Sequence, residues 1–295
     1  MKRVVRILVM FLLVLTGTVW AQQSQQQQQK QQPQQQQPQQ QQRQQAQQPG
    51  PKTVEERDAF LALRQELDPD KQVEMGDAFL AKYADSTLKS FVYEMMCNAY
   101  RQKNNFDKTV EYGEKAIQEN PNSLLALVIV SAAVPERAGD NDLDRDQKLN
   151  RSEEYAKRAL QLISQLTRPP AMNEEEWNIQ KRTFESSPHA SLGLVYLKRR
   201  MYKQAAEELK LATEMNTTQP SSIDYFRLGI AYEMEKNYDA AVPAFRRSVE
   251  LGGVTKERAQ AELDRIQKMK AQQQFPAAQP APVEKKEEKK EPEKK

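Results

Sequence analysis

The sequence is poor in the residues that carry most enzyme and metal chemistry. Its 295 residues include one cysteine, Cys97, and one histidine, His189. A single cysteine excludes an intramolecular disulfide, and the two counts together exclude a zinc site of the His–Cys type and disfavour a histidine-based triad. No Gly-rich phosphate loop, serine nucleophile motif or paired-carboxylate motif stands out. We therefore expect a protein that is not an enzyme and carries no cofactor, with both residues packed in the core.

An excess of charge of one sign is also missing once the first segment is set aside. Residues 1–21 combine Lys2, Arg3 and Arg6 with an apolar run that is too short to span a bilayer comfortably. The pattern is typical of a Sec-type signal peptide cut before Gln22, with an uncleaved anchor or a core helix as the alternatives. Cleavage would reduce the 44 basic residues to 41, equal to the 41 acidic ones. No net charge then remains to attract nucleic acid or an anionic surface.

Two further observations bear on localisation. No cysteine lies near the predicted cut, which argues against a lipid anchor, and no later run is apolar enough to cross a membrane. We therefore expect an exported protein without a transmembrane span after cleavage, in the periplasm or cell envelope rather than fully secreted.

Low-complexity sequence flanks a central folded region. Residues 22–53 are dominated by Gln and Pro, and residues 274–295 by Lys and Glu after a short Pro/Ala stretch. Neither segment has enough apolar surface to offset its conformational entropy, so both are predicted to be disordered. Between them, residues 54–273 contain little Gly and place apolar residues every three to four positions. This spacing predicts an all-α domain of about 220 residues, long enough for a substantial core.

Two stretches of this domain are internally similar. Residues 186–219 and 222–255 each carry Leu-Gly followed by Tyr three positions after the Gly, and the two glycines are 36 residues apart. Small residues at fixed places let two paired helices approach closely, while larger ones fill the space beside them. Pro188 suggests a helix start, with Ser187 as its N-cap. The matching positions are Leu192, Gly193, Tyr196 and Ala205 in the first stretch, and Leu228, Gly229, Tyr232 and Ala241 in the second.

On these residues the domain resembles a tetratricopeptide-repeat protein, a helix-turn-helix solenoid. A weaker copy covers residues 90–123, and residues 56–89 and 124–163 give two degenerate helix pairs. Two extra helices are expected. One, beginning at Met172, would bury Trp177 and Phe184, and an amphipathic one from Val254 to Gln273 would close the end of the stack.

The resemblance implies a protein–protein interaction scaffold. In this family the first helix of each pair lines a concave groove that takes a peptide or helix of a partner. The identity of the partner does not follow, and self-association through the repeats is an alternative. The positions that the resemblance places in the groove are Phe91, Glu94, Asn98 and Arg101; Ala190, Leu194, Leu197 and Lys198; and Ile223, Phe226, Ile230, Glu233 and Met234.

An acidic insert supplies a second alternative. Asp142, Asp144, Asp146 and Glu153 occupy the first, third, fifth and twelfth places of a calcium-loop pattern. Gln147 stands where the sharp turn of such a loop requires Gly, and basic residues interrupt the acidic ones. The segment is thus either a calcium-responsive loop or a solvated connection whose carboxylates pair locally.

Overall fold

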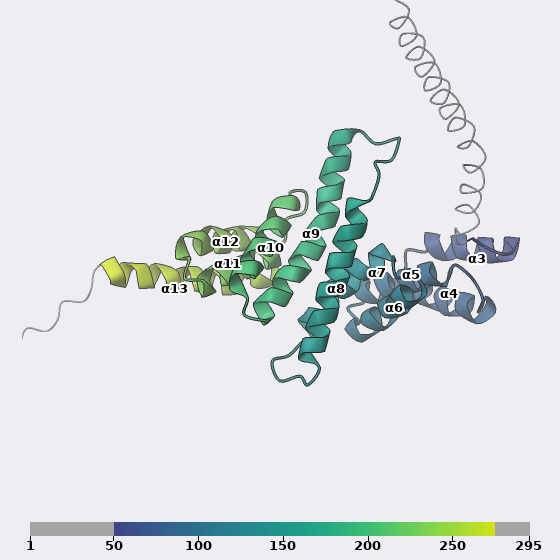
Figure 1. The fold of residues 1–295 in the computed structure, drawn as a ribbon, viewed down its shortest axis with the longest axis horizontal. Coiled ribbons are helices and arrows are strands. Elements are labelled where there is room, and N and C mark those ends of the chain that lie inside the picture. Colours follow the sequence, from purple (N-terminus) through teal and green to yellow (C-terminus); the bar gives the residue numbers. More distant parts are fainter. Residues whose placement is uncertain (1–49, 275–295) are drawn as a thin grey trace, which may run out of the picture. The chain divides into compact units, whose positions relative to one another are not determined.

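The structure is a computed structural model that describes residues 50–274 (Figure 1). Helices account for most of these residues, and no strand occurs among them. No helix in this range is long and apolar enough to cross a membrane. The predicted signal peptide, most of the Gln/Pro-rich spacer and the Lys/Glu tail lie outside the described residues. The helices are α3 (Val54–Gln65), α4 (Pro69–Lys82), α5 (Lys89–Gln102), α6 (Phe106–Glu119), α7 (Leu124–Glu136), α8 (Arg145–Ser164), α9 (Glu174–Lys198), α10 (Tyr202–Met215), α11 (Ser222–Met234), α12 (Tyr238–Leu251), the 3₁₀ turn η1 (Gly253–Thr255) and α13 (Lys256–Gln274).

The described residues fall into two units, of which residues 50–57 and 85–88 form the smaller. Its centre is Glu56, whose side chain is buried, with the residue 2% exposed. The Glu56 carboxylate accepts hydrogen bonds from the Ser86 hydroxyl and the Lys52 backbone N–H, both at 2.5 Å. The hydrogen bond from Ser86 is the main reason why the pKa of Glu56 lies below its ordinary value despite burial.

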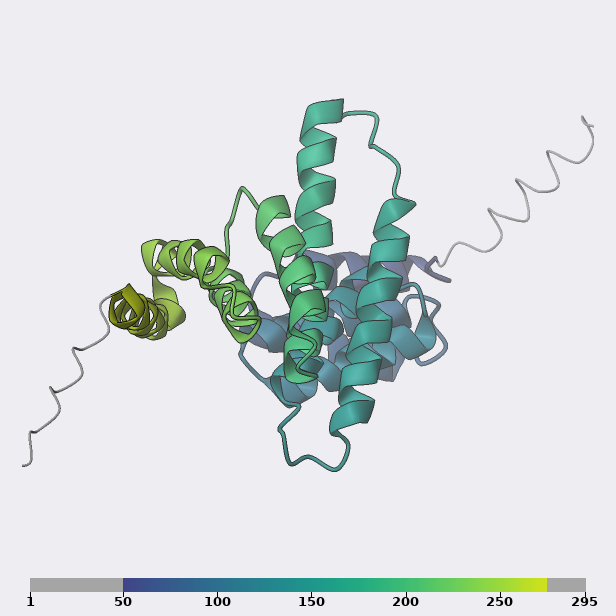
Figure 2. The ribbon, with the colours of Figure 1, turned by 60° about the vertical axis from the view of Figure 1, so that its left-hand side comes forward.

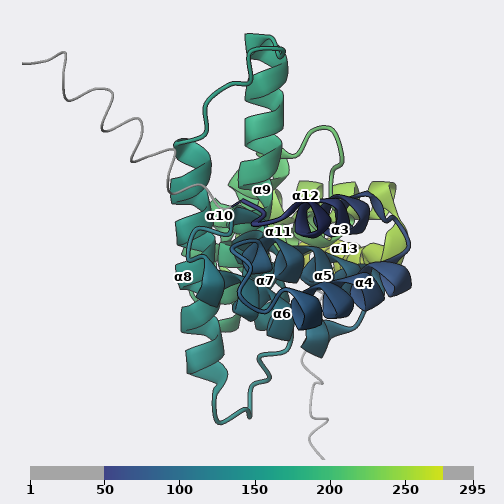
Figure 3. The ribbon, with the colours of Figure 1, turned by 90° about the vertical axis from the view of Figure 1, so that its right-hand side faces the viewer.

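The larger unit, residues 58–84 and 89–274, is a stack of helix pairs. From α4 to α13 each helix packs against the next one in the chain, and Figures 1–3 show this stacking from three directions. The first helices of successive pairs also touch: α5 contacts α7, α7 contacts α9, and α9 contacts α11. The predicted all-α solenoid is therefore confirmed, with the pairs α5/α6, α7/α8, α9/α10 and α11/α12.

The same turn joins the two helices in the three clearest repeats. Asn104, Arg200 and Lys236 have φ angles of 55°, 60° and 62°, the left-handed conformation that often ends a helix. In each turn the next backbone N–H reaches back to the carbonyl of a tyrosine, at 2.8–3.0 Å. The second helix then starts at Phe106, Tyr202 and Tyr238, and Asn105 and Asn237 cap the first and third of these helices.

The recurring Gly and Ala of the repeats have the packing role expected of them. A Cβ added at Gly229 would lie 2.6 Å from the Phe245 ring, and one at Gly193 would overlap the Leu209 side chain. Ala241 is fully buried. The glycine of the first helix therefore lies directly against a large residue of the second, and no side chain fits between them.

Helix α9 differs from the prediction. One 25-residue helix replaces the expected extra helix and a second helix capped by Ser187. A capping box between Asn173 and Glu176 starts α9 early, and the helix continues through Pro188, which costs it one backbone hydrogen bond. In all three ribbon views its first half extends past the neighbouring pairs (Figures 1–3). Phe184 is consequently 42% exposed rather than buried.

Helix α13 ends the stack as predicted. Its residues Ala259, Leu263 and Ile266 are buried in a cluster with Phe226 and Phe245. The opposite side of the helix, including Gln260, Gln267 and Lys268, is exposed. A polar outer face of this kind is what a solenoid needs at its end.

Candidate functional site

Three adjoining hollows follow the first helices α5, α7 and α9. We name them the apolar pocket, about 540 Å³, the central pocket, about 570 Å³, and the charged pocket, about 260 Å³. Leu125 and Val128 line the first two, and Ala132 and Glu136 line the last two, while Ser187 lines all three. Because neighbouring hollows share wall residues, we treat them as one groove.

Helix α7 forms the floor of the groove. Leu125, Val128, Ala132 and Glu136 are spaced by three and four residues, so they lie on one helix face. Most of the other α7 side chains, such as Leu127 and Val130, are buried in the core. Leu125 by contrast is 45% exposed. An apolar side chain open to solvent at the centre of a concave surface is typical of a binding site.

At the start of α7 lies the apolar pocket. Half of its wall residues are aromatic or aliphatic, and Glu94 is its one ionisable residue. The Ser123 hydroxyl donates a hydrogen bond to the Glu94 carboxylate. Burial nevertheless raises the pKa of Glu94, because the charged form has lost water. The apolar side chains of this wall are Phe91, Leu124, Leu125, Val128, Ile163 and Phe184.

The far end of α7 carries cations. In the central pocket the Arg137 guanidinium lies over the Phe106 ring, 4.6 Å from its centroid. Arg101 donates to the Asn98 side-chain oxygen at 2.9 Å. These two arginines place positive charge at this end of the groove, where the acidic Glu136 pairs with Arg227, in contrast to the end that holds Glu94.

The charged pocket is held together by Arg227. This residue forms ion pairs with Glu136 and, at 3.7 Å, with Asp224. Burial raises the pKa of Asp224, and the Arg227 charge opposes that rise. Since the three groups largely satisfy one another, this pocket offers a ligand fewer free charges than the central one.

The structure places some of the predicted groove residues here and not others. Phe226 is 6% exposed and packs on Phe245 with ring centroids 5.8 Å apart, so it is a core residue in this structure and not part of the groove wall. Lys198 donates to the Ala138 carbonyl at 2.9 Å, and Asn98 holds Arg101. Outside the three pockets are Asn98, Leu197, Lys198, Ile223, Phe226, Ile230, Glu233 and Met234, whereas Phe91, Glu94, Arg101, Ala190 and Leu194 line them.

Sequence reasoning missed the floor of the groove. Applied to the degenerate pair that begins at Leu124, the positions that select Phe91 and Glu94 in the 90–123 repeat would have selected Leu125 and Val128. The signal was present, but the uniformly apolar sequence of α7 resembled a buried helix.

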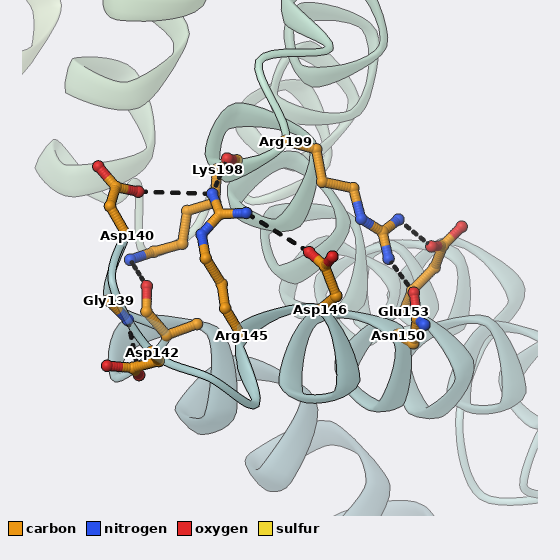
Figure 4. Close-up of polar contacts among 10 residues, drawn as sticks. Gly139, Asp140, Asp142, Arg145, Asp146, Asn150, Glu153, Lys198 and Arg199 are labelled. Atoms are coloured by element: carbon orange, nitrogen blue, oxygen red, sulfur yellow. Dashed lines mark hydrogen bonds and ion pairs between the residues drawn. The ribbon is translucent and has the colours of Figure 1, made fainter.

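The acidic insert is not arranged as a calcium loop in this structure. Helix α8 begins at Arg145, so Asp146 and Glu153 lie on a helix and not in a loop. Figure 4 shows Asp142 and Glu153 on opposite sides of Arg145. Asp142 and Asp144 instead pair with Lys148, at 2.8 and 3.0 Å. Across residues 50–274 no group of three or more His, Cys, Asp or Glu residues is placed to hold a metal ion.

The carboxylates of this region join helices together. Glu153 of α8 pairs with Arg199 and Lys157 and accepts a hydrogen bond from the Tyr196 hydroxyl at 3.1 Å. Arg145 donates to the Lys198 carbonyl at the end of α9 (Figure 4). Burial alone would raise the pKa of Glu153, but the hydrogen bonds from Lys157 and Arg199 lower it to about 2. We call this cluster the α8–α9 clamp.

The lone cysteine and histidine belong to the packing of the pairs. Cys97 is fully buried, and burial raises its pKa to about 12, which makes the thiol unreactive. His189 is half-buried, with Nδ1 2.6 Å from a Glu208 carboxylate oxygen. Neither side chain lines the groove.

Comparison with known proteins agrees with the pairing. Residues 225–251, which cover most of α11 and α12, match the tetratricopeptide repeat family. The chain thus contains a tetratricopeptide repeat, and the other three pairs repeat its arrangement. No curated protein matches the chain.

Two solved structures resemble it more distantly. One is the MamA RS-1 ArsTM double mutant, with 11% identity and a TM-score of 0.47 over 70% of this chain and 97% of that one. The other is TTC0263, a thermophilic TPR protein of Thermus thermophilus, with 12% identity and a TM-score of 0.45 over 72% of this chain and 98% of that one. At such scores the assignment of the repeat depends on residues 225–251 and on the helix pairs themselves.

Proposed function

We propose that this protein is a non-enzymatic, exported scaffold that holds a peptide or helix of a partner protein in the groove on α5, α7 and α9. The observation that carries the proposal is the continuous groove with Leu125 exposed on its floor. Tetratricopeptide repeats mediate protein interactions, and an apolar strip with charged ends suits the apolar face of a helix or an extended segment.

The dimensions of the groove favour a short segment. Leu125 and Glu136 are eleven residues apart on one helix, so the floor is about 16 Å long. That length matches about three turns of a helix or about five residues of an extended chain. A partner would therefore contribute one linear motif rather than a broad surface.

Site-specific photo-crosslinking tests the groove. A photoreactive residue replaces Leu125 in one version of the full chain and Leu211 in the control. Leu211 lies on α10, is 37% exposed and lines none of the pockets. We expect a partner peptide to be crosslinked from position 125 and not from 211. Identical crosslinked products from both positions would refute the groove.

Export is tested separately. Residues 1–21 have the pattern of a cleavable leader. After expression in the native host, N-terminal sequencing of the mature protein should begin at Gln22. A protein that keeps Met1 or stays with cytoplasmic markers on fractionation would contradict export and leave the groove proposal untouched.

Self-association is the alternative that the sequence left open. Deleting α13 would also expose the core, because Ala259, Leu263 and Ile266 cover the Phe226–Phe245 pair, so a change in mass could not be assigned to a lost contact between copies. Light scattering of the full chain, with and without Ala261→Arg on the exposed side of α13, is the sharper test. We expect the same mass for both; an oligomer that the substitution disrupts would favour the alternative.

A further inference from the structure

We propose that the apolar pocket is a subsite for a basic side chain of the bound segment, a lysine or arginine whose charge meets Glu94 and whose methylene stem packs on the apolar wall. The inference rests on the proposed function, since the pocket is one end of the same groove. It adds the chemistry of the ligand at that end.

The first observation is that Glu94 has no cationic partner among residues 50–274. It is half-buried, and a hydroxyl, that of Ser123, is the donor to its carboxylate. In the described part of the chain no Lys, Arg or His forms an ion pair with it. A half-buried carboxylate that lacks a counter-ion is unfavourable, and its raised pKa is in keeping with this.

The second observation is that the nearby cations are engaged elsewhere. On α5, Lys89 pairs with Glu119 at 3.0 Å. Arg158 of α8 donates to Asn122, which itself lines the pocket. Arg101, also on α5, donates to Asn98. On α9, Lys181 donates to the Ser164 carbonyl at 3.2 Å and Arg182 to the Glu214 carbonyl at 2.9 Å.

The third observation is the shape and nature of the wall. Phe91 and Phe184, 36% and 42% exposed, line the pocket together with Leu124, Leu125 and Val128. Lysine and arginine have long apolar stems that favour such surfaces, and their charged groups are attracted to aromatic faces. A cavity of about 540 Å³ is ample for one such side chain and the backbone that carries it.

Other ligand chemistries fit less well. An anionic group would be repelled by Glu94, and a purely apolar group would remove the remaining water from its carboxylate without supplying a counter-charge. An anionic group instead suits the other end, at Arg101 and Arg137. The groove therefore orients its ligand, with the basic residue beside the first turn of α7 and an acceptor beside the last.

A pair of small probes tests the subsite without knowledge of the partner. n-Butylguanidinium and its neutral counterpart n-butylurea are titrated into the full chain, and binding is followed by amide resonances of residues around the pocket. We expect the cation to bind about fivefold more tightly, the ratio that about 1 kcal/mol from one partly exposed ion pair gives. Glu94→Gln should abolish this preference, whereas Glu154→Gln, the same change at an exposed glutamate of α8 that lines none of the pockets, should keep it.

Three results would overturn the subsite: equal affinity of the two probes, a preference that survives in Glu94→Gln, or no saturable binding of the cation at the pocket. These outcomes are separable from failure of the groove itself. If crosslinking from position 125 still captures a partner peptide while the probe test fails, the groove stands and the subsite is wrong. If the probe test succeeds and crosslinking fails, the pocket binds small cations but does not bind a partner segment. The proposed role of the pocket as a subsite for a partner's basic side chain is then overturned.

Discussion

Replacing Glu153 by glutamine should loosen the α8–α9 clamp. The pKa of Glu153 is about 2, against an ordinary value of 4.5. A difference of that size corresponds to about 3 kcal/mol of stability at neutral pH. The Glu153 side chain is 19% exposed, so solvent weakens its ion pairs, and we expect a measured loss of about 2 kcal/mol.

The sign of the pH dependence follows from the lowered pKa. The contribution of Glu153 is fully present above about pH 4.5 and is lost as the pH falls through that value toward about 2. Urea unfolding of the wild type and Glu153→Gln should therefore differ most near pH 7 and converge near pH 2. Repeat arrays can unfold in parts, so the comparison uses the unfolding of the region that contains α8 and α9.

Glu154→Gln is the matched control. It makes the same chemical change one residue along the same helix, at an exposed side chain. We expect it to change stability by less than about 0.5 kcal/mol. A loss in Glu153→Gln no larger than in this control, or a difference from wild type that persists undiminished at pH 2, would refute the clamp.

Three further predictions concern packing. Gly229→Ala should lower stability by about 1–3 kcal/mol, because the new Cβ meets the Phe245 ring, and Phe245→Leu in the same chain should recover part of that loss in urea titrations. Cys97 should fail to react with a thiol reagent at pH 8 in the native protein and should react fully in urea; native labelling at the unfolded rate would contradict its burial. Arg265→Ala should cost about 1–3 kcal/mol by thermal unfolding, since Glu233, 9% exposed, loses its ion pair, and an unchanged melting temperature would argue against that pair.

The sequence was sufficient to predict the repeat because its strongest signals are local. Gly193 and Gly229 mark close helix contacts wherever the pairing occurs, and the apolar spacing of three to four residues gives the helices directly. The end helix was predictable for the same reason, as Ala259, Leu263 and Ile266 form one stripe.

The candidate site was harder to predict from the sequence, because the exposure of its residues depends on which helices surround them. Phe226 occupies a groove position in its own repeat, yet α13 covers that end of the stack and buries it. Leu125 lies in a degenerate repeat whose first helix gives no amphipathic signal, yet it is exposed on the floor. Position within a repeat is a local property, whereas exposure depends on the neighbours of that repeat.

The length of α9 was missed for a different reason. Pro188 normally favours the start of a helix and costs about 3 kcal/mol in a helix interior, yet α9 continues through it with a helical segment on each side. The capping box at Asn173 supplies a better start well before Ser187, and the helix then runs through both residues without a break.

The left-handed turns also bear on how far this fold could be stabilised by design. Arg200 and Lys236 adopt a backbone conformation that is unfavourable for residues with a Cβ, with φ at 60° and 62°. Glycine takes this conformation freely, so each replacement is expected to add about 0.5 kcal/mol after its greater unfolded-state entropy is counted. The natural sequence thus lies below the stability that its own backbone permits, and protein engineering could raise that stability at the hairpin tips without altering a residue of the groove.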